Sequence, residues 1–160
     1  MIENKGLAEE LDKIGKLGSV FDKEIQKGLK DLGQDWRDDV KKTISVGESN
    51  KYTVVDRKTG RKKTVSHTGG QLRKSTKFDG VYREGGKLVF SVSNNQDYVE
   101  HYEYGHRQEP GRFVPALGKR LKASYVKGRY TFREARVRAL NKLPGVIRGA
   151  IQRAEEKIND

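Results

Sequence analysis

The first third of the chain has an apolar residue at every third or fourth position, and this spacing limits what the chain can fold into. Ten steps cover 37 positions, or 3.7 residues per step. A helix has 3.6 residues per turn, so such a series stays on one face. The members are Leu7, Leu11, Ile14, Leu17, Phe21, Ile25, Leu29, Leu32, Trp36, Val40 and Ile44. We predict a long amphipathic helix within residues 1–47, with its apolar stripe packed in the core or an interface.

Gly15, Gly18, Gly28 and Gly33 lie inside this predicted helix. Each glycine in a helix interior costs about 1 kcal/mol relative to alanine. We therefore expect a bend or break near Gly15–Gly18 or near Gly28–Gly33, and we expect the packing of the apolar stripe to supply the helix with its stability.

From Tyr52 onward the apolar period changes to two, which is typical of strands. Residues 52–55 and 63–66 flank a basic turn and predict a hairpin. Residues 76–82 and 87–93 predict a second pair of strands around Gly85 and Gly86. Beyond Asn94 and Asn95, residues 98–104 predict another strand, which ends at Gly105.

The last part of the chain returns to helical patterns. Pro110 and Pro115 frame a loop, and the residues after Pro115 predict a short helix. Residues 131–134 have the form of a capping box, and Pro144 suits the first turn of a final helix.

This order of elements predicts a single α+β domain over residues 1–160. A long amphipathic N-terminal helix (1–47) packs on an antiparallel sheet (68–114). A basic hairpin is inserted at 48–67, and C-terminal helices occupy 115–160.

The charge is unevenly distributed. Lys and Arg number 34 against 22 Asp and Glu, which gives a net charge of +12 over 160 residues. Residues 1–47 carry −1 and residues 48–160 carry +13. Residues 57–77 hold eight basic residues and no acid, and residues 118–153 hold eleven against Glu134 alone. Such blocks indicate either an anionic partner, most often nucleic acid, or a solvated face.

Composition excludes several classes of protein. There is no cysteine, so disulfide frameworks, thiolate metal sites and cysteine nucleophiles are excluded. No apolar run approaches the ~20 residues that span a bilayer, and no secretory signal is visible. Only 33% of the residues are hydrophobic, so we expect part of the core to be completed by a partner.

The sequence offers no catalytic constellation. Its three histidines, His67, His101 and His106, lack the spacing of a zinc site. In the predicted strand, Glu100 and Glu103 would point to opposite faces, which argues against paired acid–base carboxylates. The glycine pairs lack the context of a nucleotide-binding loop. We predict a protein that is not an enzyme and has no cofactor and no required metal.

Aromatic residues gather in the predicted strands. Tyr98, Tyr102 and Tyr104 would share one strand face, beside Phe78, Tyr82 and Phe90. Such a face could stack bases of single-stranded nucleic acid. Tyrosine is also a good strand residue that half-buries its ring, and we favour this interpretation.

Three segments, read in order, resemble a family of phage head–tail joining and tail-completion proteins. Residues 68–75 (TGGQLRKS) are similar to a T-G-x-L-R-x-S motif, residues 98–105 (YVEHYEYG) to Y-A-x-Y-V-E-F-G, and residues 112–117 (RFVPAL) to P-F-L-x-P-A-L. The matching residues are Thr68, Gly69, Leu72, Arg73, Ser75, Tyr98, Glu100, Tyr102, Glu103, Gly105, Phe113, Pro115, Ala116 and Leu117. In this family such residues are structural.

The resemblance implies a virion protein of the phage neck or tail end, assembled in the bacterial cytoplasm. It implies a homo-oligomeric ring, a hexamer rather than a dodecamer, that completes the tail or joins it to the head around the DNA path. Expected partners are head-connector and tail-tube or tail-terminator proteins, with non-specific contact to packaged DNA and no membrane. The alternative is a non-catalytic nucleic-acid-binding protein that uses the basic segments.

The tip of the inserted hairpin is the candidate contact site. It carries five cations with no acid among them, which repel one another unless they are solvated or face an anion. They are Arg57, Lys58, Arg61, Lys62 and Lys63. One hypothesis is that this tip faces the central channel or an acidic neighbouring ring; the other is that it is a solvated loop.

Overall fold

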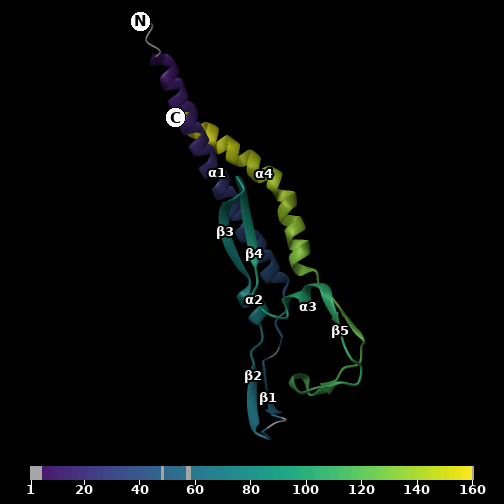
Figure 1. The fold of residues 1–160 in the computed structure, drawn as a ribbon. Helices are drawn as coiled ribbons and strands as arrows, with labels where there is room; N and C mark the ends of the chain where they lie inside the picture. The colour runs from purple at the N-terminus through teal and green to yellow at the C-terminus, as the bar shows by residue number, and fades with distance from the viewer. Residues whose placement is uncertain (1–4, 48, 57–58, 160) are drawn as a thin grey trace. The chain divides into compact units, whose positions relative to one another are not determined.

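The α+β class predicted from the sequence is confirmed. The structure is a computed structural model that describes residues 5–47, 49–56 and 59–159 (Figure 1). Its elements are, in order, α1 (Lys5–Thr43), β1 (Asn50–Val55), β2 (Lys62–His67), α2 (Gln71–Ser75), β3 (Lys77–Glu84), β4 (Lys87–Ser93), α3 (Val99–Tyr104), β5 (Gly105–Arg107), β6 (Phe113–Val114), the 3-10 helix η1 (Pro115–Leu117), β7 (Lys119–Arg120), β8 (Tyr125–Lys127) and α4 (Thr131–Asn159). None of the described helices is long and apolar enough to cross a membrane.

The chain divides into two compact units. Unit 1 comprises Met1–Arg37, Phe78–Val92 and Arg136–Asp160, and unit 2 comprises Asp38–Lys77 and Ser93–Ala135. Both α1 and α4 therefore contribute residues to each unit.

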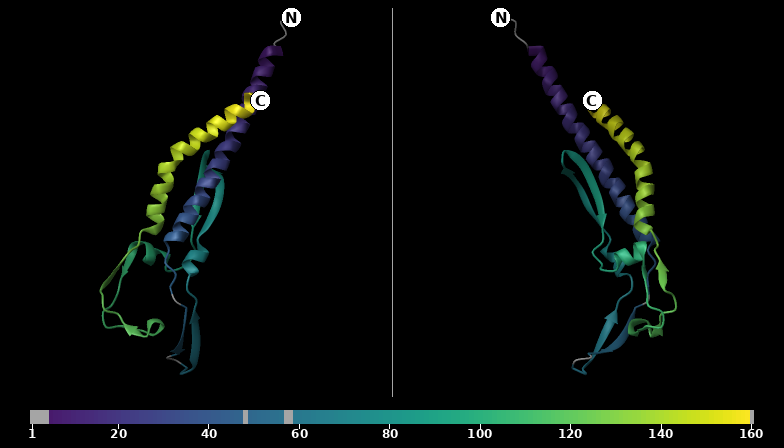
Figure 2. Two further views of the ribbon diagram at one scale, coloured as in Figure 1. Left: turned by 180° about the vertical axis from the view of Figure 1, so that it is seen from behind. Right: turned by 45° about the vertical axis from the view of Figure 1, so that its right-hand side comes forward.

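Unit 1 is built on the apolar stripe of α1. The β3–β4 hairpin and the C-terminal part of α4 lie alongside this helix (Figure 2). Its buried apolar side chains are Leu29, Leu32, Ala139, Ala150 and Ala154. The small alanines of α4 allow the two helices to approach closely.

The expected break in the N-terminal helix is wrong, because α1 runs without interruption through Gly15, Gly18, Gly28 and Gly33. Two of these glycines make room for neighbours within unit 1. A Cβ on Gly28 would lie 2.7 Å from Cγ1 of Val146, and a Cβ on Gly33 would collide with the ring of Phe78. Packing against these residues offsets the intrinsic cost of glycine, so the helix continues.

The expected start of a final helix at Pro144 is also wrong. Pro144 lies inside the single helix α4. An internal proline removes one backbone donor and clashes with the preceding turn, which typically bends a helix rather than ending it when packing holds both halves. Figure 2 shows α4 bent along its length, and Val146 packs at Gly28 just beyond the proline.

The strands form antiparallel pairs rather than one continuous sheet. Both predicted hairpins are confirmed, as β1–β2 in unit 2 and β3–β4 in unit 1. In unit 2, Tyr52 pairs with Val65 across β1–β2. Two further pairs, β5–β8 and β6–β7, follow in the same unit, and the predicted short helix after Pro115 is confirmed as η1.

Two segments inside the predicted sheet (68–114) are helical, which corrects the strand predicted at residues 98–104 and the expected start of the sheet at residues 68–75. Residues 99–104 form α3, entered through a turn in which Asn94 Oδ1 accepts from Gln96 N at 3.0 Å. Apolar residues four apart, such as Tyr98 and Tyr102, fit a helix as well as a strand. Residues 71–75 form α2, which begins after Gly70 in the left-handed region (φ 80°).

Candidate assembly surfaces

The first family-like segment fixes the backbone around α2. Leu72 is buried, and the guanidinium of Arg73 donates from Nη2 to the carbonyl of Ile44 beyond the end of α1. The carbonyl of Leu72 accepts from Thr76 Oγ1 at 2.9 Å and from Asn94 Nδ2 at 2.7 Å. Leu72 and Arg73 therefore act in the scaffold.

Ser75 ties α2 to the turn before α3. Its hydroxyl accepts a hydrogen bond from Gln96 Nε2 at 2.8 Å. The same turn holds Asn94, so the side chains of two sequence segments about twenty residues apart interlock. This contact explains why a hydroxyl is useful at position 75.

The second family-like segment contains a buried carboxylate that caps α4. Glu103 is 5% exposed, and its two carboxylate oxygens accept from the backbone N–H groups of Phe132 (3.0 Å) and Arg133 (2.8 Å). A negative charge at a helix N-terminus satisfies free donors and interacts favourably with the helix dipole. Glu100, in contrast, is exposed.

Two glycines let the backbone of this segment approach the chain before α4. Gly105 has φ 83°, and a Cβ there would collide with the carbonyl oxygen of Val126. A Cβ on the buried Gly128 would collide with the carbonyl oxygen of Glu103. Tyr130, at φ 53°, completes the turn and donates from N to the Glu103 carbonyl at 3.1 Å.

The first two family-like segments meet around one hollow in unit 2. It encloses about 300 Å³, and its lining includes Thr68, Gly69, Leu72, Tyr98 and Tyr102. The structure thus brings together residues some thirty positions apart in the sequence.

The third family-like segment lies on a different, exposed surface of unit 2. Phe113 is 52% exposed and Leu117 is 60% exposed, and Pro115 begins η1. The side chain of Ala116 lies outside the described part of the chain. A hollow of about 490 Å³ here is lined by Val114, Leu117, Leu121 and Val126, with Arg112 and Glu109 among its polar members.

A further hollow, which is lined by basic side chains, adjoins the hollow lined by Leu117. It encloses about 460 Å³, and its lining includes His101, His106, Lys127 and Arg129. The two imidazole rings lie 5.1 Å apart. Both hollows include His106 and Val126 in their lining.

The hairpin tip is partly described. Arg61, Lys62 and Lys63 are exposed, whereas Arg57 and Lys58 lie outside the described residues. The turn is closed by hydrogen bonds from Gly60 N to the Asp56 carbonyl (2.8 Å) and from Thr59 Oγ1 to the Asp56 carboxylate (2.6 Å).

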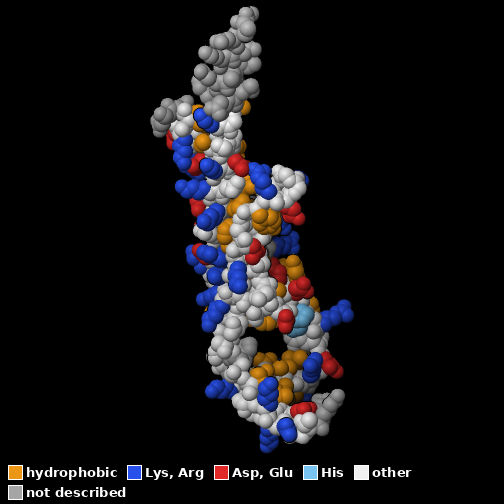
Figure 3. Space-filling view, turned by 60° about the vertical axis from the view of Figure 1, so that its left-hand side comes forward, with side chains coloured by type: hydrophobic (Ala, Val, Ile, Leu, Met, Phe, Trp, Pro, Cys, Tyr) orange, Lys and Arg blue, Asp and Glu red, His pale blue; other side chains and the backbone are white. Residues whose placement is uncertain are grey.

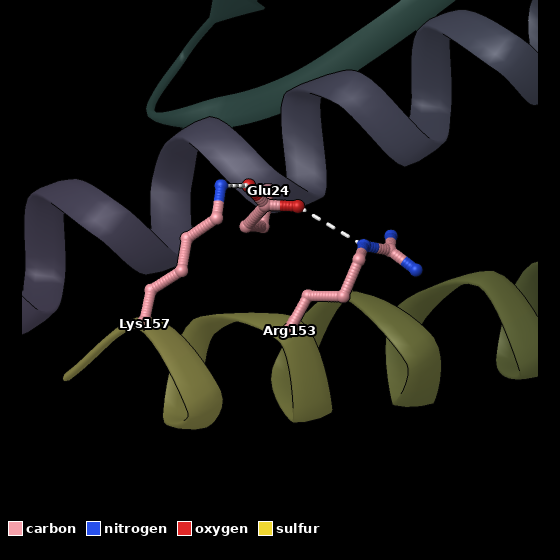
Figure 4. Close-up of polar contacts among 3 residues, drawn as sticks. All are labelled: Glu24, Arg153 and Lys157. Carbon is pink, nitrogen blue, oxygen red and sulfur yellow. Dashed lines mark hydrogen bonds and ion pairs between the residues drawn. The ribbon is translucent and has the colours of Figure 1, made fainter. Parts of the chain in front are cut away.

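In unit 1, a buried acid on α1 holds two cations of α4 (Figure 4). Glu24 is 4% exposed and accepts from Lys157 Nζ at 2.5 Å and from Arg153 Nε at 3.0 Å. The hydrogen bonds from Lys157 and then Arg153 hold the pKa of Glu24 below its ordinary value. This contact fixes the register of the two helices.

A second acid on α1 pairs with the β3–β4 hairpin. The Arg83 guanidinium donates to the carboxylate of Asp22, and this hydrogen bond lowers the pKa of Asp22. Both groups are substantially exposed, so the pair contributes little to stability.

Apolar side chains remain at the surface of both units, and Figure 3 shows orange side chains exposed among Lys and Arg. On α1, Ile14 is 63% exposed, Leu17 46% and Phe21 36%, although the same stripe is buried further along at Leu29 and Leu32. Within the described residues, no three His, Asp or Glu side chains are grouped so as to hold a metal ion.

Sequence reasoning missed the Glu24 contact, the two packing glycines and the close approach at Gly128. The glycines carried a usable signal, because Gly28 and Gly33 lie on the apolar side of α1, where a neighbour must approach. The Glu24 contact left no signal in the sequence, because Arg153 and Lys157 lie 129 and 133 positions away from Glu24.

The described surfaces of this α+β chain include exposed apolar side chains and a basic hollow, and exposed apolar patches are typical of interaction sites. The sequence model of the family described as "Bacteriophage HK97-gp10, putative tail-component" matches residues 5–105, and the protein belongs to this family. It is thus a phage structural protein whose place is the virion. Neither the curated proteins nor the solved structures include a significant match to the chain.

Proposed function

We propose that the protein forms a homo-oligomeric ring at the neck or tail end of the virion, where it completes the tail or joins it to the head around the DNA path. The ring is a hexamer rather than a dodecamer. Its neighbours are the head-connector and the tail-tube or tail-terminator proteins. The family membership supports a tail component, and the exposed surfaces support self-assembly.

One observation carries the proposal. Among the described residues, more large hydrophobic side chains are exposed than are buried, from Ile14 on α1 to Ile158 on α4. Soluble monomers rarely leave contiguous apolar patches uncovered, and such patches mark interaction sites. A chain that covers these side chains only in an assembly fits a virion ring.

The basic hairpin tip gives the ring a contact to an anion. Arg61, at the turn, and Lys62 and Lys63, the first residues of β2, are exposed and contribute little to the core. We infer that the tip faces the DNA channel or an acidic neighbouring ring, so it acts in docking rather than in folding. The family-like residues around Leu72 and Glu103 keep the scaffold in shape, and they have no catalytic role.

Sizing with and without DNA tests the ring against the alternative of a nucleic-acid-binding protein. Analytical ultracentrifugation and electron microscopy of the purified full chain should show a discrete large oligomer without DNA. A small species whose DNA affinity falls steeply with salt would support the alternative instead.

A second test uses the phage. Cells infected by a phage that lacks this gene should accumulate filled heads and separate tails, and the gene supplied in trans should restore joined particles. Normal virions without the gene product would contradict the proposal.

A further inference from the structure

Aromatic rings and permanent cations line the same hollow in unit 2, which we call the basic hollow. Its lining residues are Tyr98, His101, Tyr102, His106, Val126, Lys127 and Arg129. It encloses about 460 Å³, and no Asp or Glu of the described chain is among its lining residues. The scaffold contacts of Glu103 and Gly105 leave these rings and cations without an explanation.

The helix α3 gathers three of the rings on one face. Residues three and four apart on a helix are neighbours, so Tyr98, at the N-cap, lies on the same side as His101 and Tyr102. In the strand predicted from the sequence, His101 would instead point to the face opposite Tyr98 and Tyr102. The grouping of these rings therefore depends on the helix.

Backbone contacts hold the other lining residues beside α3. The strand β5 follows α3 directly and pairs with β8, which places His106 opposite Val126. The backbone N–H of Arg129 donates to the carbonyl of Tyr102 at 2.9 Å, so this residue is fixed next to the helix. The fold of unit 2 thus forms the basic hollow from its own segments.

The rings of the basic hollow are accessible to a ligand. Tyr98 is 39% exposed and His101 is exposed, whereas Tyr102 and His106 are half-buried. The Nδ1 atom of His106 is buried and has no hydrogen-bond partner in the described part of the chain. Buried polar atoms without a partner are rare in native proteins, so a ligand or a bound water at this hollow would supply what the fold leaves open.

Aromatic faces beside cations are the combination that binds single-stranded nucleic acid. Each unpaired base has a flat face that stacks on Tyr or His, and Lys and Arg bind the phosphates. A duplex would use the cations alone, because its bases are already stacked on one another. An acidic protein segment would also use the cations alone, because a carboxylate has no ring to stack. The aromatic lining therefore favours a single strand.

We propose that the basic hollow binds a short stretch of single-stranded nucleic acid. Bases stack on Tyr98 and His101, which are the exposed rings. Lys127 and Arg129 bind the neighbouring phosphates. This inference goes beyond the ring function and does not depend on it.

Fluorescence anisotropy of a labelled oligothymidylate of about 12 nucleotides, mixed with the purified full chain, tests the proposal. The wild type should bind this probe at low salt. Tyr98→Leu keeps an apolar side chain and removes a ring, so it should weaken binding by about 5- to 150-fold, the range expected for the loss of one stacked base. His101→Leu is the second variant and should weaken binding in the same direction. Circular dichroism shows that each variant is folded.

The cations have a matched control. Lys127→Gln combined with Arg129→Gln removes two charges from the basic hollow. Lys74→Gln combined with Lys122→Gln removes two exposed cations of unit 2 that do not line it. The first pair should reduce the slope of log affinity against log salt by about 1.4, as expected for two lost phosphate contacts to a single strand. The control pair should keep the slope of the wild type.

Several results would overturn the proposal. The wild type could fail to bind the probe, or a duplex of the same length could bind more tightly than the single strand. Wild-type affinity in both leucine variants would show that the rings take no part. If those variants bind normally and a labelled oligoglutamate peptide binds through Lys127 and Arg129, the hollow takes an acidic protein segment instead. Sizing without nucleic acid reports on the ring alone, so the ring function and this site can fail separately.

Discussion

The carboxylate of Glu103 accepts a hydrogen bond of 2.8 Å from the backbone N–H of Arg133, thirty residues further along the chain. The same carboxylate caps Phe132, so a buried acid from α3 satisfies two donors at the start of α4. Helix N-termini leave four N–H groups without intrahelical partners, which explains the value of a carboxylate there.

Replacing Glu103 with alanine should destabilise the protein by about 1–3 kcal/mol, because two backbone donors at the start of α4 lose their buried acceptor. For a chain of this size that corresponds to a fall of roughly 2–12 °C in Tm, measured by thermal unfolding. Glu103→Gln should reduce the free energy of unfolding by less than Glu103→Ala does, since an oxygen acceptor remains. The exposed Glu100→Ala is the control and should stay within about 0.5 kcal/mol of the wild type. Equal effects at the two positions would contradict the capping role.

Gly33→Ala should destabilise unit 1 by about 1–3 kcal/mol, because the added methyl group collides with Phe78 and overpacks the core. Gly15→Ala is the matched control on the same helix. Nothing lies within 4 Å of its added Cβ, so it should raise helix stability by roughly 0.5–1 kcal/mol. Urea unfolding of the two variants measures the contrast. Stabilisation by Gly33→Ala would show that the helix does not pack there.

The contact of Glu24 with Lys157 and Arg153 predicts a pH dependence. Its pKa in the folded chain is below the ordinary value of 4.5, so its stabilising contribution is complete above about pH 4.5. The contribution is lost as the pH falls through the lowered pKa. Glu24→Gln should therefore be less stable than the wild type at pH 7, and this difference should shrink in acid. Urea midpoints across pH measure it, with the exposed Glu155→Gln as the control. A difference that does not vary with pH would refute this assignment.

Trp36 should report on the packing of α1. It is half-buried, and its ring meets Phe90 edge-on with centroids 6.0 Å apart. Trp36→Ala should cost about 3–5 kcal/mol, as for other large aromatic truncations, and so unfold the protein or block its assembly. The chain has one tryptophan, so its emission should be shifted to shorter wavelength than that of hydrated indole. Emission like that of free tryptophan in the assembled protein would contradict the packing.

Changing all five hairpin cations, Arg57, Lys58, Arg61, Lys62 and Lys63, to serine should leave the fold and thermal unfolding unchanged. We expect the phage with this variant to yield heads and tails that fail to join, or particles that lose DNA, because the docking charge is gone. A five-fold arginine-to-lysine and lysine-to-arginine exchange keeps the charge and is the control. Normal infectivity of the serine variant would show that the tip is a solvated loop with no role in docking.

Local patterns in the sequence determined much of this protein. The 3.7-residue spacing predicted α1, and alternation predicted both hairpins, because periodicity depends only on which face of an element is buried. The family resemblance identified a tail component from short motifs. In the structure Leu72 is buried, and Arg73 and Glu103 hydrogen-bond to backbone groups of distant segments, whereas the secondary structure predicted around them was wrong.

Tertiary structure decided whether α1 continues through its glycines and whether residues 98–104 form a helix or a strand. Both depend on neighbours that the sequence does not identify. In the sequence, Gly28 and Gly33 predict a break in the helix. In the structure, Val146 and Phe78 pack against these glycines, and the helix continues. The seven residues from Tyr98 satisfy both periods, and the choice of α3 places Glu103 where its carboxylate meets the start of α4. Contacts across thirty or more residues select between local alternatives of similar free energy, and local pattern alone cannot make that selection.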